Sequence, residues 1–178
     1  MLPVVAVRWI SMTAMACVLT FWTSAVSAQN QTTSGVRKAY RVACASPESE
    51  SIVQEFIAAT EQLSSTEIDP WMMQGMRATA HIMLAESMVN PFEKLQQFNT
   101  WKLPLEEAIE KSPTNPDLRL FRLSIQWKVP FFLGYSDEID TDLEQVQDAV
   151  DAGFWSSDPE HAVFALAFIQ HVRDDHSH

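Results

Sequence analysis

The chain has 178 residues, of which 12 are Lys or Arg and 23 are Asp or Glu, giving a net charge of −11 at pH 7. An acidic surface of this size repels phosphate backbones and anionic lipid headgroups, so the composition argues against nucleic acid as a partner and against peripheral attachment to a membrane. The length suits a single domain.

The first 28 residues have the pattern of a signal peptide. A single basic residue, Arg8, precedes an apolar run from Trp9 to Val26, and the segment closes with Val26-Ser27-Ala28. We therefore expect cleavage before Gln29 and a periplasmic or secreted protein. The apolar run is also about the minimum length of a membrane span, so a retained leader that anchors the protein is the alternative. Membrane contact is expected only in that case.

Cysteine usage limits how the fold is stabilised. Cys17 lies in the leader, so Cys44 alone remains after cleavage and no internal disulfide can form. The fold must then rest on its apolar core. We interpret Cys44 as a small core residue, with a reactive thiol or an intermolecular bridge as the alternative.

The segment 29–45 begins with polar residues and contains Gly35, which predicts a flexible lead-in. A single helical domain is predicted over residues 46–173. Its first helix starts at Ser46-Pro47-Glu48 and runs to about Ser64 with one apolar face.

Two further helices follow. Asp69-Pro70 predicts a helix to about Val89 that is apolar on two sides and therefore packed between neighbours. Asn90-Pro91 starts the next one, where Pro104 predicts a kink or a fresh start near Leu103, because proline cannot donate to the preceding turn. A tight polar turn at residues 112–116 ends it.

The helix beginning near Leu118 is apolar around most of its circumference and ends at Pro130. The acid-rich segment 137–151 predicts another helix, with Gly153 as its C-terminal cap. Asp158-Pro159 starts the last one, and His161 is expected at the surface of its first turn.

The segment from Leu105 to Asn115 resembles the second helix and exit turn of a tetratricopeptide repeat, because Ala108 and Pro113 lie five residues apart, as do the closing Ala and Pro of that repeat. The wider stretch from Asn90-Pro91-Phe92 to about Asp140 resembles an uncharacterised family of small exported helical proteins of Bacteroidetes-type bacteria. The two resemblances imply paired antiparallel helices, an all-helical fold and an envelope or extracellular setting. They imply no activity.

No segment alternates between apolar and polar residues with period two, so little or no sheet is expected. The prediction is an all-α fold of about six antiparallel helices, in a tetratricopeptide-like stack or an irregular bundle. Residues 174–178 are predicted to be a disordered tail containing histidines.

A polar strip on the helix near Leu118 is the first candidate site. Arg119, Arg122 and Gln126 fall on one face of an otherwise apolar helix. In one interpretation the arginines pair with acids on adjacent helices and tie the packing together. In the other they line a binding groove, together with Glu93 and Tyr135, and grip a carboxylate such as the end of a peptide. The acids considered as partners are Glu86, Glu93, Glu107 and Glu110.

A metal site is the weaker alternative. Thioether and imidazole groups are ligands for soft metals such as copper, and the sequence has a methionine-rich helix and a histidine-containing tail. The candidate ligands are Met72, Met76, His81, His176 and His178. Met72 and Met76 also lie on a face that should be buried, so core packing is the preferred interpretation of the methionines. We expect no cofactor.

Enzyme signatures are absent from the sequence. There is no phosphate-binding glycine loop, no Gly-x-Ser-x-Gly and no paired-histidine zinc motif. We therefore predict a non-catalytic protein- or peptide-binding module of the cell envelope, with a periplasmic copper- or zinc-handling protein as the alternative. An enzyme acting from an acidic cleft near Glu93, Arg119 and Arg122 is a third possibility.

Overall fold

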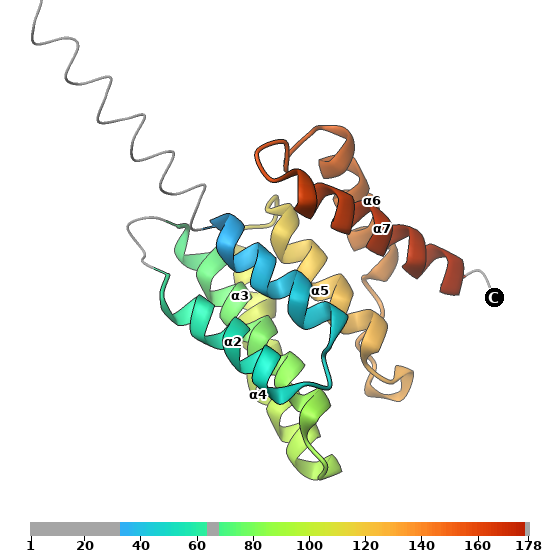
Figure 1. Cartoon of the computed structure of the whole chain (residues 1–178). Helices are drawn as coiled ribbons and strands as arrows, with labels where there is room; N and C mark the ends of the chain where they lie inside the picture. Colours follow the sequence, from blue (N-terminus) through green and yellow to red (C-terminus); the bar gives the residue numbers. More distant parts are fainter. Residues whose placement is uncertain (1–32, 64–67, 177–178) are drawn as a thin grey trace, which may run out of the picture.

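The computed structural model describes residues 33–63 and 68–176, and the predicted leader lies outside this part of the chain. The described residues form seven helices packed as a bundle, and they include no strands. The all-α prediction is confirmed. Figure 1 shows the helices up to α5 packed side by side, with α6 and α7 stacked on one side of α5.

The helices follow one another with short connections. The first described helix covers residues 33–45. The others are α2 (Glu50–Glu61), α3 (Pro70–Met83), α4 (Pro91–Lys111), α5 (Pro116–Lys128), α6 (Ile139–Asp151) and α7 (Pro159–His176). Two short 3₁₀ helices, η1 (Leu84–Ser87) and η2 (Phe131–Leu133), extend the ends of α3 and α5.

Helix starts follow the Asp/Asn-Pro pairs in the sequence. Asn90 and Asn115 accept hydrogen bonds from the backbone N–H groups of Phe92 and Asp117, both at 3.0 Å. In each case a proline occupies the first helical position, where its missing N–H costs nothing. These side chains therefore fix where the long helices begin.

Four local predictions differ from the structure. The segment 29–45 was expected to be a flexible lead-in, but residues 33–45 are helical and bury Tyr40 completely. α2 begins at Glu50 rather than near Ser46, and α3 ends at Met83. α4 is one continuous helix through Pro104, so no fresh start occurs near Leu103, and α3 packs along this helix.

The C-terminal end also differs from its prediction. Residues 174–176 belong to α7 rather than to a disordered tail, and residues 177–178 lie outside the described part of the chain.

No helix in the described ranges combines the length and apolar character needed to span a bilayer.

The core is organised around α5. Seven consecutive residues, 120–126, are buried, so neighbouring helices cover every side of this helix. Gly75 lets α3 approach closely, because a Cβ atom at this position would overlap Cδ2 of Leu118 and lie 3.5 Å from Cβ of Ala108. Three helices thus meet at one point where there is no room for a side chain.

The substitution Gly75→Ala should destabilise the protein by about 1–3 kcal/mol, the usual cost of overpacking a core. The matched control is Gly35→Ala, since a Cβ there meets nothing within 4 Å and alanine favours a helix. Urea unfolding of both variants would measure the difference. Equal stability of the two variants would contradict the close packing at Gly75.

Candidate binding groove

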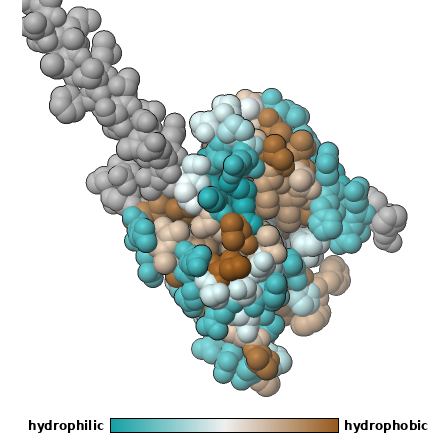
Figure 2. Space-filling view, viewed as in Figure 1, coloured by the Kyte–Doolittle hydropathy of each residue, from teal (hydrophilic) through white to brown (hydrophobic). Residues whose placement is uncertain are grey.

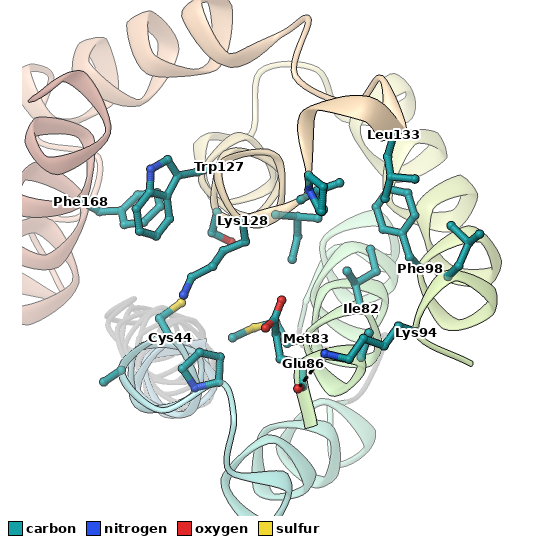
Figure 3. Close-up of a pocket in the computed structure, with 18 of the residues that line it drawn as sticks. Cys44, Ile82, Met83, Glu86, Lys94, Phe98, Trp127, Lys128, Leu133 and Phe168 are labelled. Carbon is teal, nitrogen blue, oxygen red and sulfur yellow. Dashed lines mark hydrogen bonds between the residues drawn. The ribbon is translucent and has the colours of Figure 1, made fainter. Parts of the chain in front are cut away.

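A groove of about 710 Å³ opens between the C-terminal end of helix 33–45 and several other elements of the bundle. α3 and α4 form one side, α5 with η2 forms another, and α7 closes the third (Figure 3). Its lining is mainly apolar and includes Ile82, Met83, Phe98, Trp127, Leu133 and Phe168. Sites of this size and character accept apolar ligands or side chains.

Local sequence explains why the groove stays open. Pro130 ends the helical path of α5, and Gly134 adopts a left-handed conformation with φ of 59° that turns the chain away. η2 therefore projects from the body, with Phe131 87% and Phe132 83% exposed. Across the groove, Phe92 at the start of α4 is 83% exposed.

Charged side chains lie at the edges of this groove. Arg41 is already paired, with Glu160 at 2.8 Å and Asp158 at 3.6 Å. The Lys94 ammonium donates to the backbone carbonyl of Glu86 at 3.3 Å, and the Lys128 ammonium lies 5.2 Å from the centre of the Trp127 ring. Within the described ranges, neither lysine has a carboxylate within 4 Å.

Cys44 lines the groove beside Lys128 (Figure 3). Burial raises the pKa of its thiol to about 12, although the charge of Lys128 acts in the opposite direction. The thiol is therefore protonated at neutral pH. A protonated thiol is a weak nucleophile, so this environment favours packing over reactivity.

The predicted polar strip lies elsewhere, in an ion network between α5 and α6. Arg122 grips the Asp142 carboxylate with two hydrogen bonds of 2.7 and 2.8 Å, and a third reaches Glu106 at 2.9 Å. Arg119 contacts Asp142 at 3.3 Å, and the Tyr135 hydroxyl donates to Glu106. The acids that pair with the arginines are thus Asp142, Glu106 and, at 3.8 Å, Glu138, rather than those considered from the sequence.

The other two residues predicted for this site lie apart from that network. The Gln126 side chain is buried, and its Oε1 has no hydrogen-bond partner. Glu93 is exposed at the start of α4 and accepts a hydrogen bond from Asn90 at 3.3 Å. None of the five residues predicted as a binding site lines the apolar groove.

The proposed metal ligands are dispersed. Met72 and Met76 are buried in the core, and the Met72 sulfur accepts a hydrogen bond from Asn115 at 3.5 Å. His81 stacks on Trp101 with ring centres 4.0 Å apart, and partial burial lowers its pKa. His176 ends α7 and His178 lies outside the described residues. Residues 33–63 and 68–176 hold no cluster of three His, Cys, Asp or Glu side chains arranged for a metal ion.

A second buried polar cluster surrounds Asp117. This carboxylate accepts two hydrogen bonds from Arg37, at 3.0 and 2.6 Å, and one from the Trp155 indole at 3.0 Å. Nε2 of His161 lies 3.3 Å from the same carboxylate. The prediction of a surface position for His161 is wrong, because its side chain is completely buried. The cluster joins helix 33–45, α5 and the beginning of α7.

Sequence reasoning missed both the apolar groove and the Asp117 cluster. Arg37 lies 80 positions before Asp117, and Trp155 lies 38 positions after it, so no local spacing brings them together. The available signal for the groove was limited to apolar residues next to Pro91 and Pro130, and the sequence does not show that they are exposed. A comparison of the chain with family models, curated proteins and solved structures finds no match. The chain is a small all-helical protein with no family identified.

Replacing Arg122 with Met should cost about 3–5 kcal/mol of stability, because it leaves the Asp142 carboxylate buried without its main partner. Arg119→Met should cost less, since that arginine makes a single 3.3 Å contact with Asp142. Urea unfolding measures both. If Arg122→Met left the midpoint unchanged, this network would not hold α6 on α5.

The Asp117 cluster predicts a pH dependence. Burial alone would raise the pKa of Asp117, but contact with His161 and the charge of Arg37 outweigh it and hold the pKa below its usual value. The stabilisation is therefore complete above the unfolded pKa of about 3.9 and is lost as pH falls through the lower folded value.

Asp117→Asn should destabilise the protein by about 3–5 kcal/mol at pH 7, because the Arg37 charge loses its hydrogen-bonded carboxylate. The gap between wild type and variant should begin to narrow below about pH 4, where Asp117 of the unfolded chain binds a proton, and should close as the pH falls through the lower pKa of the folded state. Denaturation midpoints between pH 2 and 7 measure this. Parallel curves would exclude Asp117 as a contributor.

Proposed function

We propose that this protein is a non-catalytic binding module whose apolar groove receives the apolar face of a helix from a partner protein. The observation that carries the proposal is the apolar surface that continues from the groove onto its rim. Phe92 and Phe132 line the groove and stay more than four-fifths exposed, and Phe131 extends this surface beyond it. Helix-in-groove recognition uses surfaces of this kind.

The size of that surface favours a protein over a small molecule. An aromatic side chain carries roughly 150–250 Å² of surface, so the three phenylalanines together expose roughly 500 Å². This exposed area alone is similar to that of the largest apolar patch on a typical monomer, and it does not include the apolar floor of the groove. A small molecule in the groove would leave Phe131 and Val89 in water, whereas a helix about 10 Å wide can lie across the rim.

The rest of the visible surface supports the choice of site. Figure 2 shows a mostly hydrophilic or mixed face, with apolar side chains gathered in a few separate patches. One of these patches is at the tip where α4 begins, and the exposed large apolar residues near the start of α4 are Val89 and Phe92. An apolar patch kept on an otherwise acidic protein is typical of an interaction site.

The cellular setting and the repeat-like pairing remain part of this proposal. The leader pattern of residues 1–28 supports export to the periplasm or beyond, where the partner would be met. The tetratricopeptide-like interpretation of residues 105–115 is supported by Ala108, which is completely buried beside Gly75 of α3. The Bacteroidetes-type resemblance stays a prediction.

The test uses a fluorescent 18-residue helical peptide with leucines at i, i+3, i+4 and i+7, and a scrambled peptide of the same composition. Phe92→Ala and Phe132→Ala should each weaken binding of the first peptide about tenfold, as truncation of an aromatic anchor does. The control is Val163→Ala on α7, which is 68% exposed and outside the groove. It should leave binding unchanged, as measured by fluorescence anisotropy.

Two results would contradict the proposal. The first is equal binding of the scrambled and the helical peptide, which would indicate nonspecific adsorption. The second is an equal effect of the Phe132 and Val163 substitutions. Thermal melting of each variant shows that folding is intact, which is expected because all three side chains are exposed.

A further inference from the structure

The charges around the groove differ in sign from those of the whole protein. The chain as a whole carries −11, yet the groove is lined by Arg41, Lys94 and Lys128 against one carboxylate, that of Glu86. Arg41 is neutralised by Glu160 and Asp158. Two ammonium groups therefore remain at the groove without a carboxylate partner in the described residues.

The two lysines come from different walls. Lys94 projects from the first turns of α4 and Lys128 from the last turn of α5, and Figure 3 shows them on opposite sides of the groove. The Lys94 ammonium is held by a carbonyl of Glu86, and Lys128 lies over Trp127 beside the protonated Cys44. Each ammonium has donors to spare, since a lysine carries three N–H groups.

Other titratable groups near the groove are already engaged. Asp175 of α7 accepts a hydrogen bond from the Trp127 indole at 3.1 Å. The His171 ring packs edge-on against Trp127, with ring centres 4.9 Å apart. These contacts leave the two lysines and Glu86 as the unmatched charges of the groove, two positive against one negative.

We propose that the partner helix is acidic, with carboxylates on both sides of its apolar stripe, one meeting Lys94 and the other Lys128. This inference rests on the proposed function, since it names the chemistry of the helix received by the groove. The apolar stripe fills the groove, and the flanking carboxylates select for acidic helices and against basic ones. Charge complementarity of this kind sets specificity more than affinity.

The overall negative charge does not oppose this selection at physiological salt. Charges are screened beyond about 8 Å at 0.15 M, so a bound carboxylate responds mainly to the lysine beside it. Salt dependence therefore separates local attraction from overall repulsion. If the lysines dominate, added salt weakens binding of an acidic helix, and if the net charge dominates, added salt strengthens it.

The experiment uses three 18-residue peptides with the same leucine face, flanked by Glu, Gln or Lys. Fluorescence anisotropy with the full mature chain should give tighter binding for the Glu peptide than for the Gln peptide, by about two- to fivefold for each lysine engaged. The Lys peptide should be the weakest. Binding of the Glu peptide should also weaken between 50 and 500 mM salt.

Charge-reversal variants show whether Lys94 and Lys128 cause the preference for the Glu peptide. Lys94→Glu and Lys128→Glu should each reduce the preference for the Glu peptide, and the double variant should favour the Lys peptide. The control is Lys38→Glu, which makes the same change in net charge on an exposed face of helix 33–45 outside the groove. It should leave the order of the three peptides unchanged.

The outcomes separate this inference from the proposed function. Equal binding of the three peptides, with leucine dependence intact, would overturn the acidic helix and leave the groove as a docking site. Stronger binding of the Glu peptide at high salt would overturn it as well. If no leucine-faced peptide binds, both the acidic-helix inference and the proposed function are overturned. Both are also overturned if sedimentation shows that a second copy of the chain occupies the groove through Phe132.

Discussion

The burial of α5 on all sides is the constraint on which the rest of the structure depends. Polar side chains on a fully surrounded stretch of helix cannot reach water, so most of them need a partner inside the protein, with Oε1 of Gln126 as an exception. Asp117 at its start is matched by Arg37 and Trp155, and Arg122 in its middle by Asp142. The two networks hold the helix 33–45 on one side of α5 and α6 on the other.

This arrangement explains why parts of the molecule were predictable from sequence and others were not. Helix starts depend on neighbouring residues. The start at Asn90-Pro91 was predicted correctly, whereas α5 begins at Pro116, two residues before the predicted start near Leu118. The helix at 33–45 was missed because its entry looks polar, while its burial comes from contacts with distant partners such as Asp117. The continuity of α4 through Pro104 likewise depends on packing against α3, whose residues are distant from Pro104 in the sequence.

The candidate sites also combine features set by neighbouring residues, which were predictable, with features set by distant contacts, which were not. A helical spacing correctly placed Arg119 and Arg122 on one face, but it could not say what that face meets. Asp142, which pairs with both, lies 20 positions beyond Arg122 and sits in a segment that reads as solvated and acidic. The groove was hidden for a different reason, since apolar residues such as Phe132 look the same in a sequence whether they are buried or exposed.

The Asp117 cluster has a mechanical consequence for the groove. His161 ties the first turn of α7 to the core, and near the other end of the same helix Asp175 accepts a hydrogen bond from the Trp127 indole, against which Phe168 also packs. α7 is therefore held at both ends, by Asp117 at its start and by Trp127 of α5 near its end. The wall that α7 contributes to the groove is thus in place before a ligand arrives, so binding has little to order on that side.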